Sequence, residues 1–103
     1  MKSSLHIGAI IYPRMDQTDL TGPFEVLSRL PNSKFHIIAK DRFSIRDEKG
    51  LILTPEETIL QAPKLDLLIV PGGPGQEAMM EDEVILSFIQ KQSEKAHLIL
   101  TTC

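Results

Sequence analysis

Short apolar runs alternate along this chain with stretches of helical period, and this alternation restricts the fold more than any other feature. Four runs are too short for helices and consist mainly of strand-forming residues: 5–12 (LHIGAIIY), 34–40 (KFHIIAK), 65–70 (LDLLIV) and 98–102 (LILTT). The first run is apolar at nearly every position, as in strands that are buried on both faces. Strands that alternate with helices form mostly parallel sheets, so the sequence predicts an α/β domain.

The first helical stretch follows residue 16. Its apolar residues suit one face of a helix: Leu20, Phe24, Val26, Leu27 and Leu30. Two starting points are open. Asp16 at the N-cap with Asp19 three residues later would form a variant of the capping box. Pro23 favours a start near Gly22 instead, because proline is tolerated best in the first turn of a helix.

The remaining stretches complete the pattern. Residues 42–53 are polar around a turn at 48–50, which predicts a small hairpin or an edge excursion, and residues 81–95 predict a helix. Residues 98–100 are apolar without interruption, which suits a central strand better than an exposed edge. A helix should follow such a strand and cover the sheet. We therefore predict that residues 1–103 are the N-terminal part of one larger α/β domain, whose C-terminal part is missing from this chain.

The charge balance argues against one class of partner. The chain of 103 residues has 11 Lys and Arg against 14 Asp and Glu, with a formal net charge of −3, and its basic residues are scattered. Domains that bind nucleic acid gather positive charge on one surface, so no nucleic-acid partner is expected. No apolar run approaches the roughly 18 residues of a membrane span, and the N-terminus has no apolar signal core. We expect a cytoplasmic protein without a membrane partner.

Disulfide and metal chemistry have little support in the sequence. Cys103 is the one cysteine, so the chain cannot form an internal disulfide or a cluster of thiolate ligands. His6, His36 and His97 lie far apart in the sequence and share no ligand spacing. We interpret each histidine as a strand-edge or packing residue and predict no metal site.

Three chemically notable features follow the ends of predicted strands. Asp19 comes after the first strand. Gly72 and Gly73 follow LDLLIV, and Cys103 follows LILTT. Parallel strands bring their carboxyl ends to one edge of the sheet, where open α/β sheets bind ligands. Consecutive glycines let backbone amides approach a ligand, as in an oxyanion hole, and a thiol before a helix N-terminus ionises readily. The sequence therefore predicts a site that joins these four residues.

Each feature also has a purely structural interpretation. A lone cysteine is usually a small buried apolar residue, an aspartate such as Asp19 often caps a helix, and glycine runs often form simple turns. The spacing of Gly73, Gly75 and Ala78 also matches a dinucleotide-binding fingerprint loosely. We discount that match, because the loop does not follow the first strand and no acidic residue closes the next one.

The same residues carry a resemblance to a known family. The matching stretches are Tyr12-Pro13, 18–23 (TDLTGP), 25–27 (EVL), 65–66 (LD), 70–75 (VPGGPG), 80–82 (MED) and Thr102-Cys103. Through them the chain resembles the ThiJ/PfpI superfamily and, within it, the isocyanide hydratase group. The resemblance extends from residue 7 to residue 103.

The resemblance implies a flavodoxin-like three-layer α/β sandwich with a mostly parallel sheet, a homodimer, a small-molecule substrate and no cofactor. It implies that Cys103 is a nucleophile at a strand-to-helix elbow, with Asp19 as the acidic residue beside the thiol. Gly72 and Gly73 match the backbone donors near that thiol. The implied reaction adds water to an isocyanide and yields an N-substituted formamide.

Three other functions occur in the same superfamily, of which a protease- or deglycase-like activity fits least, because those groups usually have a glutamate where Asp19 stands. Related AraC-type transcription regulators share the DLTGP-like and PGG-like stretches, and this chain would then bind an effector without turnover. A redox or stress-response role would oxidise Cys103 to a sulfinic acid instead. Asp19 with the LTGP that follows it favours the hydratase. Because the elbow and the covering helix are missing after Cys103, we expect this chain to be inactive alone.

Overall fold

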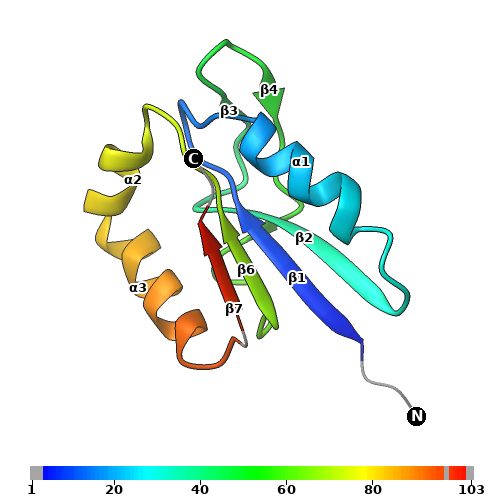
Figure 1. Ribbon diagram of the computed structural model, residues 1–103. Helices are drawn as coiled ribbons and strands as arrows, with labels where there is room; N and C mark the ends of the chain where they lie inside the picture. The colour runs from blue at the N-terminus through cyan, green and yellow to red at the C-terminus, as the bar shows by residue number, and fades with distance from the viewer. Residues whose placement is uncertain (1–3, 97, 102–103) are drawn as a thin grey trace.

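A five-stranded sheet runs through the middle of the structure, and helices cover both of its faces (Figure 1). The computed structural model describes residues 4–96 and 98–101. The strands of the sheet are β1 (Leu5–Ile10), β2 (Ser33–Ala39), β5 (Glu57–Thr58), β6 (Leu67–Val70) and β7 (Leu98–Thr101). The helices are α1 (Thr18–Leu27), α2 (Gln76–Glu81) and α3 (Glu83–Ser93). The arrangement confirms the predicted three-layer α/β fold.

All neighbouring strands of this sheet are parallel, in the order β5-β2-β1-β6-β7. The central strand is β1, and Ile7, Ala9 and Ile10 on it are buried. A strand between two parallel neighbours, with helices above and below, has both faces out of water. This explains why its sequence is almost continuously apolar rather than alternating.

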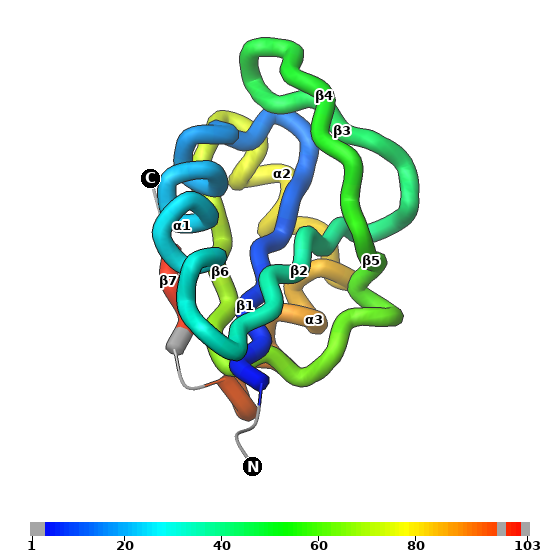
Figure 2. Tube along the Cα trace, turned by 90° about the vertical axis from the view of Figure 1, so that its right-hand side faces the viewer, coloured from blue at the N-terminus to red at the C-terminus, as the bar shows by residue number. Residues whose placement is uncertain are grey.

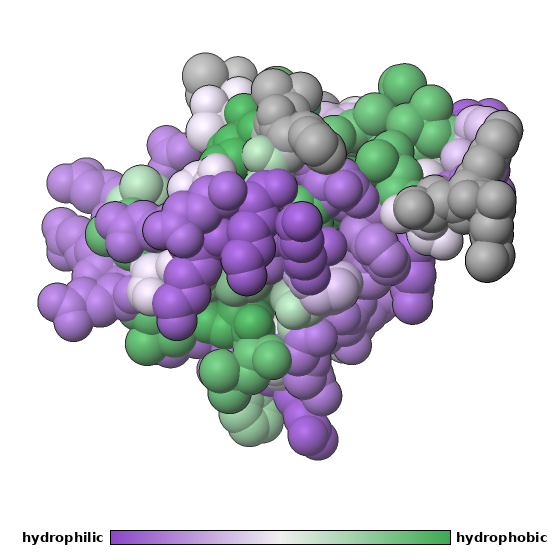
Figure 3. All heavy atoms as spheres, turned by 90° about the horizontal axis from the view of Figure 1, so that it is seen from below, coloured by the Kyte–Doolittle hydropathy of each residue, from purple (hydrophilic) through white to green (hydrophobic). Residues whose placement is uncertain are grey.

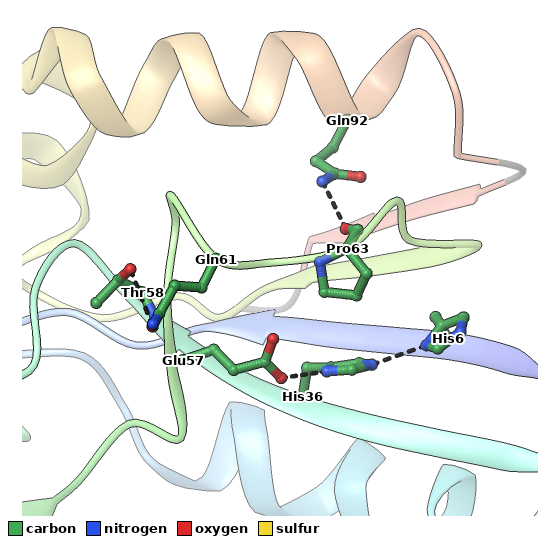
Figure 4. Close-up of polar contacts among 7 residues, drawn as sticks. All are labelled: His6, His36, Glu57, Thr58, Gln61, Pro63 and Gln92. Carbon is green, nitrogen blue, oxygen red and sulfur yellow. Dashed lines mark hydrogen bonds and ion pairs between the residues drawn. The ribbon is translucent and has the colours of Figure 1, made fainter.

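The two faces of the sheet are covered differently. Helix α1 lies on one face, and α2 and α3 lie on the other (Figure 1). On the first face, the ring of Phe24 meets the ring of Phe35 edge-on, with 5.0 Å between the ring centroids. On the second face, the side-chain amide of Gln92 donates to the carbonyl of Pro63 at 3.0 Å (Figure 4). Its oxygen accepts from the Leu65 amide at 3.0 Å. One buried side chain thus connects α3 to the entry of β6.

Helix α1 begins at Thr18, which corrects both starting points considered from the sequence. Gln17 occupies the N-cap position, and its side chain makes no capping hydrogen bond. Asp16 lies one residue earlier, and its carboxylate accepts from the Thr18 amide at 3.0 Å. Pro23 lies inside the helix. The first turn closes before Gly22, because the amides of Leu20 and Thr21 both donate to the carbonyl of Gln17.

The helix predicted over residues 81–95 is confirmed as α3, whereas α2, which ends at Glu81, was not predicted from the sequence. Asp82, with ψ of 110°, separates α2 from α3. Its carboxylate accepts from the amides of Val84 at 2.9 Å and Ile85 at 3.3 Å, so it caps α3. Lys40 also donates to this carboxylate, at 2.7 Å. The cap and the ion pair together stabilise the turn at Asp82 between the two helices.

The predicted hairpin is confirmed. Strands β3 (Ile45–Arg46) and β4 (Ile52–Leu53) pair antiparallel and stand above the carboxyl ends of the sheet (Figure 2). Buried Asp47 closes the turn, because its carboxylate accepts from the amides of Lys49 at 2.9 Å and Leu51 at 2.8 Å. The sequence analysis did not predict β5, a strand of only two residues that pairs with the end of β2.

Polar and apolar residues share the surface. Figure 3 shows the molecule from below, where polar residues are interrupted by smaller apolar areas. Large apolar side chains that remain exposed include Val26, Phe43 and Leu60. None of the helices within the described ranges is long and apolar enough to span a lipid bilayer.

Candidate functional site

The carboxyl ends of β1, β6 and β7 lie side by side. Strand β6 pairs with β1 on one side, and on the other side Val70 at its end pairs with Thr101 at the end of β7. Two loops therefore leave the sheet at the same edge: the first loop (residues 11–17, after β1) and the glycine loop (residues 71–75, after β6). This is the edge at which the sequence predicted a site.

Backbone hydrogen bonds hold the two loops together. The amide of Asp16 donates to the carbonyl of Gly72 at 2.8 Å, and the amide of Gly75 donates to the carbonyl of Arg14 at 3.0 Å. The second bond occupies an amide that a bound pyrophosphate would need at this position. The Gly75 amide is therefore not available to bind a dinucleotide, which argues further against that interpretation.

Two glycines are required by this close contact. Gly73 has a φ of 138°, and a Cβ atom on it would lie 2.5 Å from the amide nitrogen of Asp16. A Cβ atom on Gly75 would lie 2.0 Å from the carbonyl oxygen of Pro13. Both distances are too short for any side chain, so only glycine permits the approach. The glycines at positions 73 and 75 are therefore explained, at least in part, by the packing of the two loops against each other.

The amides of Gly72 and Gly73 are not consumed by the loop contact. Neither donates a hydrogen bond to another residue in the part of the chain that the structure describes. Successive amides at the end of a strand are the arrangement from which oxyanion-binding sites are built. The two predicted backbone donors are therefore free to serve another group.

Asp19 lies in the first turn of α1 and is half-buried. A helix N-terminus favours a negative charge there. The carboxylate also affects the phenol of Tyr12, whose pKa is raised to about 12. Burial is the largest cause of this rise, followed by the negative charge of Asp19 and then that of Asp16. Asp19 is thus within electrostatic reach of a side chain that contacts the glycine loop.

Tyr12 is the residue of this region to which the sequence analysis assigned no role. Its side chain is only 1% exposed, and its hydroxyl donates to the carbonyl of Pro71, at the start of the glycine loop. A buried tyrosine hydroxyl usually has a hydrogen-bond partner, so a tyrosine at the end of an apolar strand was the signal for such a contact. The partner itself could not be identified from the sequence.

Cys103, the predicted nucleophile, lies outside the described residues. Strand β7 ends at Thr101, two positions earlier in the sequence and directly beside Val70 of β6. A cavity of about 420 Å³ lies at these strand ends, with Val70, Met80, Ile99 and Thr101 in its lining. The association of Cys103 with Asp19 and the glycines stays a prediction.

A second cavity, of about 260 Å³, lies where β2 ends and α3 begins. Its lining is largely apolar and includes Ile11, Met79 and Ile85. Lys40 and Asp82, which form the ion pair described above, also line it. That ion pair already satisfies both charges, so the cavity presents no unpaired charged group from these two residues.

A separate polar cluster crosses β1, β2 and β5 (Figure 4). The Nδ1 atom of His6 lies 2.9 Å from the Nε2 atom of His36, and Nδ1 of His36 contacts the carboxylate of Glu57. Two of the histidines that are distant in the sequence are therefore neighbours in the fold. Across residues 4–96 and 98–101, no group of three or more His, Cys, Asp or Glu side chains is placed to hold a metal ion.

Sequence comparison identifies similar proteins over nearly the whole chain. The profile of the DJ-1/PfpI family matches residues 6–103. An isonitrile hydratase from Pseudomonas putida is 40% identical over 100 residues, which cover 97% of this chain and 44% of that protein.

Solved structures give the same answer for the fold. A ThiJ/PfpI family protein from Pseudomonas syringae superimposes with a TM-score of 0.94 at 30% identity, over 98% of this chain and 43% of that one. DJ-1beta from Drosophila melanogaster has a TM-score of 0.84 at 22% identity, over 97% of this chain and 55% of that one, and is similar in fold alone. The chain thus spans less than half the length of the Pseudomonas proteins that it matches.

Proposed function

The chain belongs to the DJ-1/PfpI family, and from this membership we propose that the protein is an isocyanide hydratase-like enzyme, a hydro-lyase that converts an isocyanide and water into an N-substituted formamide. The observation that carries the proposal is the 40% identity to an isonitrile hydratase over 97% of the chain, since isonitrile and isocyanide are two names for one functional group. The match covers 44% of that relative, so the activity is proposed for the complete gene product.

The local geometry supports this assignment at three points. Asp19 lies in the N-terminal turn of α1, three residues after Asp16, whose amide is bonded to the glycine loop. The glycine loop is held against the first loop, with the amides of Gly72 and Gly73 free among the described residues. Cys103 follows β7 by two positions, which would bring its thiol to the same edge.

The proposed chemistry begins with the thiolate of Cys103. It attacks the terminal carbon of the isocyanide and forms a carbon–sulfur bond, while Asp19 transfers a proton to that carbon. The product of this step is a thioimidate. The amides of Gly72 and Gly73 stabilise the negative charge that passes between sulfur and substrate.

Water completes the reaction. Its oxygen adds to the thioimidate carbon, and its proton goes to the substrate nitrogen. The carbon–sulfur bond then breaks as the carbonyl forms, the hydroxyl proton returns to Asp19, and the thiolate is released. One water is consumed and one formamide is formed, with no change in oxidation state of the protein and no cofactor in any step.

The test is formamide production from a simple alkyl isocyanide, followed by chromatography or NMR. The complete gene product is compared with its Cys103→Ala and Asp19→Asn variants, and with the 103-residue chain alone. Turnover that is lost in both variants supports the proposal. A correctly folded gene product that binds isocyanides without turnover would support the effector-binding alternative. Oxidation of Cys103 to a sulfinic acid, with neither binding nor turnover, would support the redox alternative.

A homodimer is part of the proposal. Light scattering coupled to size-exclusion chromatography of the complete gene product measures its mass directly, and a monomer at micromolar concentration would refute this part alone.

A further inference from the structure

We infer that Tyr12 is a positioning residue for the proposed reaction, because its buried hydroxyl, bonded to the Pro71 carbonyl, fixes the direction in which the Gly72 amide points. The inference rests on the proposed function of the glycine loop. It assigns Tyr12 an indirect role, since the phenol acts through the backbone rather than on the substrate.

The argument starts from the geometry of one peptide unit. The carbonyl of Pro71 and the amide of Gly72 belong to the same planar trans peptide, so they point in opposite directions. A hydrogen bond that holds the carbonyl therefore also aims the amide. The hydroxyl of Tyr12 supplies that bond from a side chain that is 1% exposed and cannot easily move.

The next peptide unit is held in a similar way. The carbonyl of Gly72 accepts from the amide of Asp16 at 2.8 Å, which fixes the plane that carries the Gly73 amide. The φ of 138° at Gly73 lets the chain turn out of this plane directly afterwards. The first loop thus orients two successive amides: the Tyr12 side chain orients that of Gly72, and the Asp16 backbone orients that of Gly73. Only the contact made by Tyr12 can be removed by an ordinary substitution.

The hydroxyl must keep its proton to act as a donor. Burial is the main reason that the pKa of Tyr12 rises to about 12, and the charges of Asp19 and Asp16 act in the same direction. The phenol therefore stays protonated across the range in which a thiol enzyme works.

The test is Tyr12→Phe in the complete gene product, which keeps the ring and removes the hydroxyl. We expect kcat to fall by about tenfold to a hundredfold, because amides that stabilise developing charge act mainly on the transition state. KM should change by less than about threefold for the same reason. Ile7→Val is the matched control: it shortens a buried side chain of β1 outside both loops and should leave kcat within about twofold.

A second readout does not depend on the substrate. The rate at which iodoacetamide alkylates Cys103, mapped by mass spectrometry, is measured against pH. A misaimed Gly72 amide stabilises the thiolate less, so the midpoint of this profile should move to higher pH in Tyr12→Phe and stay in place in Ile7→Val. A loss of packing alone would not move it.

The outcomes separate the inference from the proposed function. If the wild-type protein shows no turnover, the hydratase proposal fails, and the alkylation midpoint alone decides the role of Tyr12. A folded Tyr12→Phe variant that matches the wild type in kcat and in alkylation midpoint would overturn the inference. If that variant does not fold, 3-fluorotyrosine at position 12 keeps the shape and ionises at lower pH. The alkaline loss of turnover should then begin at lower pH, and an unmoved profile would overturn the inference.

Discussion

The Nδ1 atom of His6 lies 2.9 Å from the Nε2 atom of His36, and the other ring nitrogen of His36 contacts the carboxylate of Glu57. The first contact joins β1 to β2 and the second joins β2 to β5, and these three strands lie side by side in the sheet (Figure 4). Short strand β5 is thus tied to the sheet by a side-chain contact as well as by its two paired residues.

His36→Phe should therefore destabilise the fold although the two rings are similar in size. His36 is 2% exposed, and its removal leaves the Glu57 carboxylate and the Nδ1 atom of His6 without their partner. We expect the free energy of unfolding to fall by about 1–3 kcal/mol, measured by urea denaturation of the complete gene product. Lys34→Gln, at an exposed position of the same strand, should change it by less than about 0.5 kcal/mol. Equal midpoints for His36→Phe and wild type would contradict this reading of the cluster.

Asp82 should matter through its cap and through its charge, and two variants distinguish them. Asp82→Ala removes both the cap of α3 and the ion pair with Lys40, so it should lower Tm by several degrees. Asp82→Asn keeps a capping oxygen and should lower Tm less. The hydrogen bond from Lys40, and then those from the Ile85 and Val84 amides, hold the pKa of Asp82 below its ordinary value. The charge-dependent stability is therefore present above about pH 4 and lost as pH falls further, in the wild type but not in Asp82→Asn. Identical acid-unfolding curves for the two proteins would show that the charge contributes nothing.

Tyr12 should make the fold sensitive to alkali. Its pKa rises from 10.0 to about 12 on folding, through burial first and the charges of Asp19 and Asp16 second. A raised pKa means that the folded state binds the proton more tightly, so this stability is complete below pH 10 and lost as pH rises toward 12. The loss should amount to about 2–3 kcal/mol. Urea midpoints recorded from pH 9 to 12 should fall more steeply for the wild type than for Tyr12→Phe, and parallel curves would refute the assignment.

The parts of the fold that the sequence predicted are those with a strong local signal. The runs at 5–12 and 65–70 are buried strands because nearly every side chain in them is apolar, and a parallel sheet follows from their alternation with helices. The same logic placed Asp19 and the glycine pair at one edge, and in the structure the loops that follow β1 and β6 are hydrogen-bonded to each other. Cys103 was assigned to that edge by the same reasoning and stays a prediction.

The parts that were missed depend on contacts between distant residues. Strand β5 is two polar residues long, and it is a strand only because the end of β2 offers it backbone partners. The break between α2 and α3 depends on Asp82, whose capping role competes with a continuous helical pattern on either side. The contact of Tyr12 with Pro71 spans 59 positions, so no local pattern reports it. Helix α1 began earlier than Pro23 suggested, because one missing amide inside a helix does not prevent the first turn from closing.

Two glycines of the chain should respond to alanine in opposite ways, and the comparison tests whether the two loops meet as described. On Gly75 a Cβ atom would lie 2.0 Å from the Pro13 carbonyl oxygen, which is backbone and cannot rotate away. Gly75→Ala should therefore destabilise the fold by at least about 1–3 kcal/mol and reduce any turnover that depends on the glycine loop. Gly22 lies exposed in α1 with no atom within 4 Å of the added Cβ, so Gly22→Ala should stabilise the fold by about 0.5–1 kcal/mol. Urea denaturation of both variants provides the measurement. If Gly75→Ala proved as stable as Gly22→Ala, the first loop and the glycine loop could not be in the contact that the proposed site requires.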